Sequence, residues 1–358
     1  MTPLFSFQLV FALAFACASG GCLAGTHADA STDSTSVGTQ TTTEGTGASS
    51  TTFAVDPPQP HQWTISAEFG EQVGSIFSIW ADRPETILAV GGQPLAGVIL
   101  EYNNGTWTAV AGLPTSTPRL NWIHGIGEMR VVVGYYGALL HREEGVWKAR
   151  MSGVEGPLWG VWGAAVDDLW AVGSGGAGEA PLLLHYDGEA WSGVDVSAIS
   201  GSSSSLYKVW GRAADDIYAI GAKGLILHYD GVAWVAEPTP VGATLIGISG
   251  DEDEVVVAGG RSTGVVLRRI DGEWHSLVFP EDEGFDGSLV DEQGYATVVG
   301  RRGFISLFVP GGGAWVREES GVDHELHSVY EVPGGPVFAV GGHFDSAPYS
   351  GVILRREP

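Results

Sequence analysis

The sequence predicts an all-β fold: a seven-bladed β-propeller of four-stranded antiparallel blades, with the ring closed by an N-terminal strand around Trp63. Tryptophan recurs every 40 to 44 residues, at Trp63, Trp107, Trp147, Trp191, Trp234, Trp274 and Trp315. Glycine recurs with a similar period, at Gly91, Gly134, Gly173, Gly221, Gly259, Gly300 and Gly341. Short runs of β-branched and aromatic residues lie between them and end in Gly or Asp-Gly turns, which is typical of strands and hairpins.

The fourth repeat shows the predicted unit of four strands, called a to d in chain order. Its segments are LYKVWG (206–211), DIYAIG (216–221), LILHY (225–229) and a last strand that starts at Trp234. Turns at Lys223-Gly224 and Asp230-Gly231 separate strands b, c and d. Helical periodicity is not evident in any segment.

The recurring tryptophans and the recurring glycines each form a ladder with one residue per repeat. The two ladders are offset along the chain, and the offset predicts how the ring closes. Trp63 precedes the first strand a, whereas the last repeat has strands a to c and no tryptophan. We therefore expect the segment around Trp63 to supply strand d to the blade at 326–358. Such pairing of the two ends removes an open sheet edge.

Residues 1–21 are predicted to be an export signal. The apolar run from Leu4 to Ala16 is too short to span a bilayer but suits the core of a signal peptide. Small residues at 19–21 and then Cys22 resemble the lipobox of bacterial lipoproteins, which implies a lipid on Cys22 and an outer-membrane-anchored protein of the cell envelope. Ordinary secretion is the alternative, because Ala16-Cys17-Ala18 fits a small-x-small cleavage pattern.

The segment 22–58 is predicted to be a disordered tether, and 59–358 to be the propeller. Residues 26–52 contain fifteen Ser or Thr and three Gly but no aromatic residue. Such a composition cannot bury enough apolar surface to fold, and it behaves as a flexible linker.

Composition excludes several classes of function. The net charge of −25 argues against a nucleic-acid partner, because phosphate contacts need clustered cations. The only cysteines are Cys17 and Cys22, so the predicted propeller contains no disulfide, thiol nucleophile or thiolate metal site. We expect no cofactor.

The repeats resemble kelch repeats. AVGGQPLAGVILEYNNGTWTAVAGLP (89–114) has the kelch order of an apolar strand, a Gly-Gly pair, a tyrosine and a tryptophan. The variant with VWG, DDLWAVG, LLHY and DGEAW in the third repeat resembles repeats of bacterial surface lipoproteins. The resemblance covers about 59–358, and it implies the fold without implying a function.

Three residue types recur at equivalent positions and are candidates for functional sites. His141, His185 and His228 occupy one position of strand c in successive blades, so repetition explains them better than metal binding. The tryptophans are expected to pack between blades with the indole N–H bonded locally. The Asp pairs 167/168 and 215/216 are expected to form hydrogen bonds at the start of strand b, which leaves no catalytic or metal-binding residue predicted.

Strand direction assigns the loops to two faces. The a–b and c–d loops form the second face, which collects 21 of the 42 acidic residues, with Arg83 and Arg212 as the only cations predicted among them. The d–a and b–c loops form the first face, which is the predicted ligand-binding surface because exposed cations, aromatic residues and loops of variable length gather there. The candidate ligand-binding residues are Lys223, Arg261, Arg301, Arg302, His343, Tyr135 and Tyr136.

These observations favour a lipid-anchored, non-enzymatic binding or scaffold propeller on a cell surface, with a protein or glycan as its partner. The alternatives are an enzyme that acts on an extracellular polymer at the propeller channel, and a structural subunit of an envelope complex.

Overall fold

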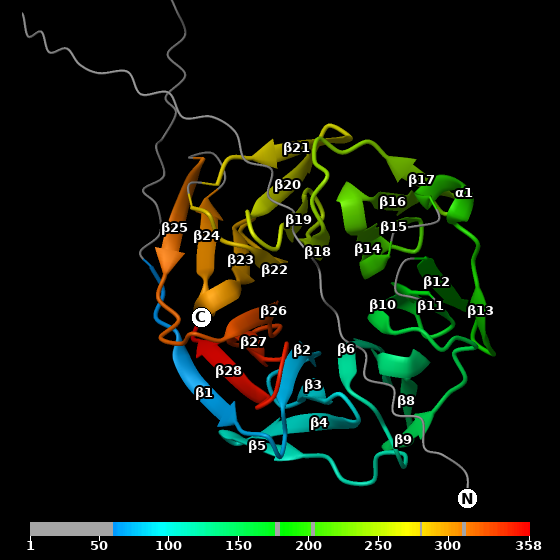
Figure 1. Ribbon diagram of the computed structural model, residues 1–358, viewed down its shortest axis with the longest axis vertical. Helices are drawn as coiled ribbons and strands as arrows, with labels where there is room; N and C mark the ends of the chain where they lie inside the picture. The colour runs from blue at the N-terminus through cyan, green and yellow to red at the C-terminus, as the bar shows by residue number, and fades with distance from the viewer. Residues whose placement is uncertain (1–59, 176–179, 202–204, 280, 310–312) are drawn as a thin grey trace, which may run out of the picture. The chain divides into compact units, whose positions relative to one another are not determined.

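Seven four-stranded antiparallel sheets surround a central axis in the computed structural model (Figure 1). The structure describes residues 60–175, 180–201, 205–279, 281–309 and 313–358, which belong to one unit spanning Phe53–Pro358. Strand a of each blade lies next to the axis, because strands a of neighbouring blades contact one another. The predicted fold class is confirmed. The predicted signal and tether, residues 1–58, lie outside the described residues, so the division into domains stays a prediction.

The first four blades follow the repeats in order. Blade 1 consists of β2 (Ser75–Ala81), β3 (Ile87–Gln93), β4 (Ala96–Asn103) and β5 (Thr106–Ala109). Blade 2 consists of β6 (Leu120–Ile126), β7 (Met129–Gly134), β8 (Leu139–Glu143) and β9 (Val146–Ala149). Blade 3 consists of β10 (Leu158–Ala165), β11 (Asp168–Ser174), β12 (Pro181–Tyr186) and β13 (Trp191–Gly193). Blade 4 consists of β14 (Leu206–Ala213), β15 (Asp216–Gly221), β16 (Ile226–Tyr229) and β17 (Trp234–Glu237).

The remaining blades complete the ring. Blade 5 consists of β18 (Leu245–Gly250), β19 (Val255–Gly259), β20 (Val265–Ile270) and β21 (Glu273–Leu277). Blade 6 consists of β22 (Phe285–Val290), β23 (Ala296–Gly300), β24 (Ile305–Val309) and β25 (Ala314–Glu318). Blade 7 consists of β26 (Glu325–Glu331), β27 (Val337–His343), β28 (Ser350–Arg356) and β1 (Thr64–Phe69). The short helices are η1 (Tyr135–Gly137), α1 (Ser197–Ser200), η3 (Ala222–Gly224) and η4 (Arg301–Gly303), and no helix in the described ranges is long and apolar enough to cross a membrane.

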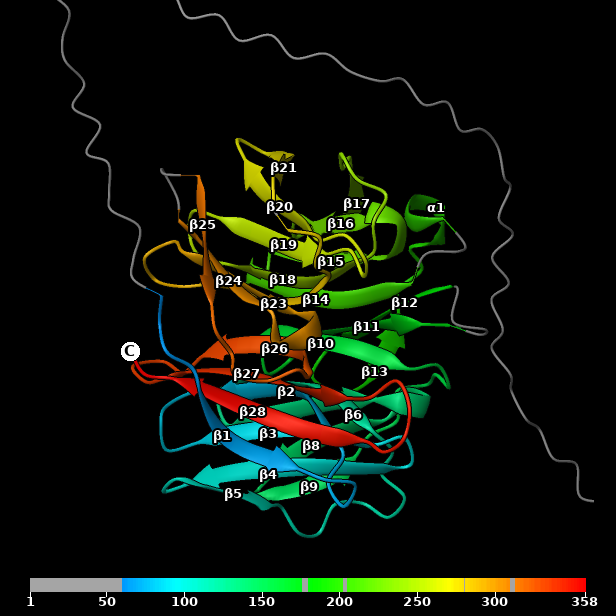
Figure 2. The same cartoon turned by 60° about the vertical axis from the view of Figure 1, so that its left-hand side comes forward.

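The ring closes as the offset ladders predict. β1 pairs with β28 in antiparallel register from Thr64↔Arg355 to Phe69↔Gly351, and the two strands run side by side in Figures 1 and 2. Trp63 lies just before β1 and is 5% exposed, in a cluster that joins blades 6 and 7. The two ends of the propeller therefore share one blade, which leaves no gap between blade 7 and blade 1.

The ladder tryptophans pack between blades, as predicted. Trp147 lies in a cluster with residues of blade 1, and Trp274 in a cluster with residues of blade 4. Where the indole N–H has a partner, that partner lies on the preceding blade: Trp107 donates to Ser66, Trp191 to His141 and Trp274 to Glu237. One tryptophan per period thus both fills the space between two blades and orients them.

Every innermost strand contains a β-bulge at the same place. The register against strand b shifts after Ile76, Leu120, Leu158, Leu206, Leu245, Phe285 and Leu326. The bulged residues, which we call the bulge ring, are Phe77, Asn121, Trp159, Tyr207, Ile246, Asp286 and His327. Because strand a starts at the first face, this ring lies at the first-face end of the axis. A bulge breaks the alternation of side chains and re-aims the extra residue.

Nearer the second face, side chains of the inner strand of one blade pack against the inner strand of the next blade. A Cβ on Gly211 would lie 2.8 Å from the Trp162 ring, and a Cβ on Gly250 would lie 2.7 Å from the Trp210 ring. Tyr330 closes the series by donating a 2.7 Å hydrogen bond to the carbonyl of Ala81. The V-W-G sequence therefore repeats because each tryptophan covers a glycine on the following blade.

Candidate functional site

The b–c loops of blades 2, 4 and 6 form one turn three times on the first face. In η1, η3 and η4 the central residue has a left-handed backbone: φ is 53° at Tyr136, 59° at Lys223 and 50° at Arg302. Residues other than glycine seldom adopt this conformation, because the Cβ crowds the backbone. All three side chains are exposed. The turn thus presents three of the predicted ligand-binding residues at equivalent positions.

The following d–a loop holds each of these turns in place. A Cβ on Gly137 would lie 2.0 Å from the carbonyl oxygen of Val154, and one on Gly224 would lie 2.0 Å from that of Val241. Hydroxyl groups fasten the same contact, because Ser152 donates to the carbonyl of Gly137 at 2.7 Å. These turns are therefore rigid supports and not loose loops.

Four predicted residues come together in one cavity of about 430 Å³ between blades 5, 6 and 7. Arg261, Arg301, Arg302 and His343 line it. Acidic side chains also line it: Asp282, Glu283, Asp323 and Glu325. Arg302 forms a 2.5 Å ion pair with Glu283, so the cavity carries mixed charge. The sequence predicted the cations without these acidic neighbours.

A buried carboxyl group lies next to this cavity. Asp286 of the bulge ring is 6% exposed. Burial raises the pKa of Asp286 well above its usual range, and the adjacent Glu325 raises it further, while Arg261 and Arg301 act in the opposite direction. Burial therefore favours the uncharged form of the Asp286 carboxyl group.

Tyr135, Tyr136 and Lys223 lie away from that cavity. Tyr136 is 64% exposed and, together with Leu95, lines a hollow of about 550 Å³ over blades 1 and 2. Leu95 is 73% exposed. Lys223 lies on blade 4 and lines neither hollow. Of the predicted set, four residues thus line the charged cavity and Tyr136 lines the hollow, whereas Tyr135 and Lys223 line neither.

An aromatic arc links the bulge ring to these regions, and Tyr135 is its one member among the predicted ligand-binding residues. Tyr207 and Trp159 have ring centroids 6.3 Å apart, and Trp159 meets Tyr135 edge-on at 5.5 Å. The chain of contacts continues through a guanidinium to two phenylalanines. The arc consists of Tyr207, Trp159, Tyr135, Phe77 and Phe344, from blades 4, 3, 2, 1 and 7.

Arg119 bridges the middle of the arc. Its guanidinium carbon lies 3.9 Å from the ring centroid of Tyr135 and 4.5 Å from that of Phe77. Phe77 then contacts Phe344 at 5.0 Å. Burial lowers the pKa of Arg119, which is 6% exposed. A guanidinium between two aromatic faces is held rigidly.

The second face is acidic, and cations of the adjoining strands add to the two predicted in its loops. Besides Arg83 and Arg212, Arg130 pairs with Asp82 at 2.8 Å and Arg268 pairs with Glu254. Arg130 lies in β7 and Arg268 in β20, so a count of loop residues omits them. These pairs neutralise part of the acidic surface.

Two of the three recurring histidines contact a recurring aspartate. Nε2 of His185 lies 2.8 Å from Asp168, and Nε2 of His228 lies 2.8 Å from Asp216. Asp168 also accepts a hydrogen bond from the indole of Trp170. These contacts tie the start of strand b to strand c, as expected for hydrogen bonds at a strand start. Within the described ranges no three His, Cys, Asp or Glu residues are placed to hold a metal ion.

Comparisons identify the fold and no family. No family model and no curated protein matches the chain. YCF48 from Cyanidioschyzon merolae is 16% identical over 83% of this chain and 99% of its own, with a TM-score of 0.64. The RRP9 WD40 repeats are 9% identical over 84% and 99%, with a TM-score of 0.65. The extracellular domain of the putative one component system BT4673 from B. thetaiotaomicron is 11% identical over 82% and 40%, with a TM-score of 0.60. At these identities the similarity shows a propeller alone.

Proposed function

We propose that this chain is a non-enzymatic binding propeller that recognises a protein through its first face. The observation that carries the proposal is the hollow lined by Leu95 and Tyr136, which are 73% and 64% exposed. Large apolar side chains that remain exposed around a hollow are typical of protein-binding surfaces. A rigid support is also present, because the η1 turn that carries Tyr136 is clamped by the loop at Ser152.

The aromatic arc extends the proposed contact surface beyond that hollow. Trp159 and Tyr207 are partly exposed, and aromatic and arginine side chains dominate the binding energy of many protein interfaces. The charged cavity around Arg261 and Arg301, on another part of the first face, supplies polar contacts. We expect the hollow and the arc to contribute most of the affinity, and the charged cavity to set the orientation.

We also propose that the protein is displayed on the cell surface as a kelch-like lipoprotein. The support is the Ser-Gly-Gly-Cys sequence before a Ser/Thr-rich segment, with the lipid on Cys22. Pro60 to Trp63 lead into β1 at the edge of the second face, because Thr64 pairs with Arg355 at the end of strand c.

Paired surface variants test the protein-binding proposal. The full-length protein is immobilised, and proteins retained from envelope extract and culture medium are quantified by mass spectrometry. Leu95→Ser with Tyr136→Ser should lose specific partners. Val232→Ser with Ile270→Ser removes exposed apolar side chains from the second face and is the matched control, since Val232 and Ile270 are 87% and 44% exposed.

The outcomes are distinct. Loss of the same retained proteins in the first-face variant alone supports the proposal. Loss in the control alone places binding on the second face and overturns it. Binding to a glycan array that both variants retain, with no protein retained, would establish a glycan-binding function instead.

A further inference from the structure

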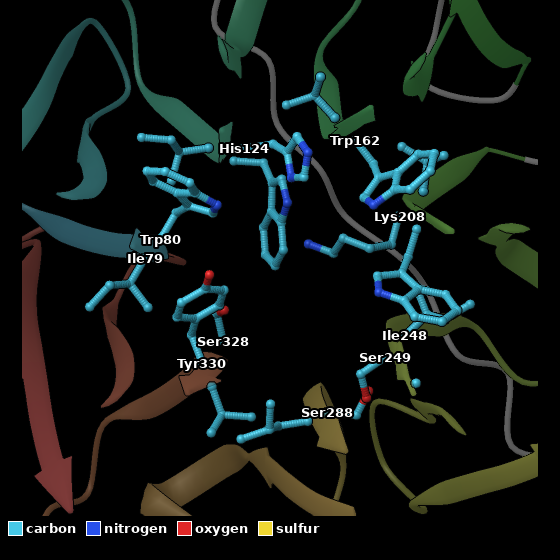
Figure 3. Close-up of a pocket in the computed structure, with 18 of the residues that line it drawn as sticks. Ile79, Trp80, His124, Trp162, Lys208, Ile248, Ser249, Ser288, Ser328 and Tyr330 are labelled. Atoms are coloured by element: carbon cyan, nitrogen blue, oxygen red, sulfur yellow. The ribbon is translucent and has the colours of Figure 1, made fainter. Parts of the chain in front are cut away.

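The central axis contains a cavity of about 220 Å³ that lies between the bulge ring and the second face (Figure 3). Residues from the inner strands of all seven blades line it. None of the described lining residues is acidic, although the chain has 42 acidic residues and a net charge of −25. The lining therefore lacks the acidic residues that dominate the rest of the molecule.

Lys208 is the cation in this cavity, and it is 3% exposed. Its Nζ lies 3.2 Å from the ring centroid of Trp122, a residue of blade 2 that meets it across the lumen. Among the described residues, no carboxylate oxygen lies within 4 Å of this Nζ and no acceptor is hydrogen-bonded to it. Fully buried lysines are almost always paired, because an isolated buried charge is unfavourable. Burial accordingly lowers the pKa of Lys208 well below its usual value, an effect that Asp286 partly offsets.

Several side-chain hydrogen-bond donors line the cavity besides Lys208. The indole N–H groups of Trp80, Trp122, Trp162 and Trp210 have no partner among the described residues. In Figure 3 the nitrogens of Trp80, Trp162 and Lys208 face the open centre. Two of the lining hydroxyl groups already donate elsewhere, Ser249 to Ser288 at 3.1 Å and Tyr330 to the carbonyl of Ala81 at 2.7 Å. An occupant that supplies acceptor oxygens and a negative charge would satisfy these groups.

We infer that the channel cavity binds a small organic carboxylate, with its carboxylate at Lys208 Nζ and its apolar body against the indole rings. The size agrees, because a cavity of about 150 Å³ accommodates benzene, and a carboxylate adds three heavy atoms. The aromatic walls suit a flat apolar body. This site is separate from the protein-binding first face, so either can be correct without the other.

Benzoate is the probe for the test, used with the full-length chain in calorimetric titrations. Benzoate should bind. Benzamide has the same shape without the charge, and its affinity should be lower than that of benzoate by about tenfold or more. Lys208→Met keeps a long apolar side chain without the ammonium group and should weaken benzoate binding by about tenfold or more. Lys148→Met is the matched control, because Lys148 is an exposed lysine paired with Glu143, and it should bind benzoate as the wild type does.

Three results would overturn the inference: no benzoate binding to the wild type, equal binding of benzamide, or undiminished binding to Lys208→Met. If Lys208→Met does not fold, lysine labelled with ¹³C at Cε gives three resonances in the wild type, from Lys148, Lys208 and Lys223. Lys148→Arg and Lys223→Arg assign them. Benzoate should shift the Lys208 resonance and raise the pKa of its amine, and a Lys208 resonance unaffected by benzoate would refute the site.

Discussion

The indole N–H of Trp63 donates a 2.7 Å hydrogen bond to the carboxylate of Glu318, which is completely buried. The same carboxylate accepts a hydrogen bond from the backbone N–H of His61 and lies 3.8 Å from the guanidinium of Arg356. Glu318 ends β25 of blade 6, whereas His61 and Trp63 precede β1 and Arg356 ends β28, the two strands that close blade 7. One buried carboxylate therefore holds the closure of the ring.

Replacing Trp63 with phenylalanine removes that hydrogen bond and keeps an aromatic ring. Because a buried carboxylate loses a donor, the free energy of unfolding should fall by about 2–3 kcal/mol, as measured by urea denaturation. Trp315→Phe is the comparison: Trp315 donates to the carbonyl of Val278 at an exposed site and should lose less stability. Equal losses would show that Glu318 does not have this role.

The left-handed residue of the η3 turn predicts a stabilising substitution. Lys223 has a φ of 59° and is exposed, so Lys223→Gly should raise the free energy of unfolding by about 0.5–1 kcal/mol through relief of Cβ crowding. Lys223→Ala keeps the Cβ and should leave stability unchanged. Thermal and urea unfolding of the three proteins check this order, and a Gly variant no more stable than the Ala variant would contradict it.

Histidines around the axis predict acid sensitivity. Burial lowers the pKa of His124 to about 4, which is below its ordinary value of 6.5. The unfolded chain therefore takes up a proton first, so stability is lost as pH falls from 6.5 towards 4, by about 1 kcal/mol per pH unit. His124→Gln can still donate to the carbonyl of Gly163 and should flatten this slope in urea titrations at pH 7, 6 and 5. An unchanged slope would assign the acid sensitivity to other groups.

Substitution of Cys22 tests the proposed anchor. Cys22→Ser should move the protein from the membrane fraction to the soluble exported fraction, because a hydroxyl cannot receive the lipid. Mass spectrometry of the wild type should find an acylated N-terminal Cys22. An unmodified N-terminus at Ser19 would instead establish ordinary secretion.

The fold was predictable because the propeller repeats its local rules. Each period contains one ladder tryptophan that fills the space between two blades, so the spacing from Trp63 to Trp315 gives the number of blades and the closing strand. The fourth repeat was predicted nearly to the residue, since β15 spans Asp216–Gly221 and β17 begins at Trp234. Turn residues and β-branched runs act over a few positions, which sequence reveals directly.

The site was less predictable, because its contacts join residues of different blades. The bulge after Leu206 breaks the two-residue alternation, so the exposure of Tyr207 does not follow from the pattern of its strand. Trp159 and Tyr207 meet only when two blades are adjacent. Likewise, Arg302 could be counted as a free cation until Glu283 was found beside it. For Trp159 and Tyr207, the available sequence signal was an aromatic residue directly after the first leucine of strand a.

The pairing of β1 with β28 also determines how the propeller would respond to mechanical force. The strand runs from the second face towards the first, and five of its residues are paired along β28. A pull on the chain before Trp63, directed away from the second face, acts along the strand axis and loads these hydrogen bonds in shear, together with the Trp63–Glu318 contact. The ring would then resist tension through its closure before any single blade begins to unravel.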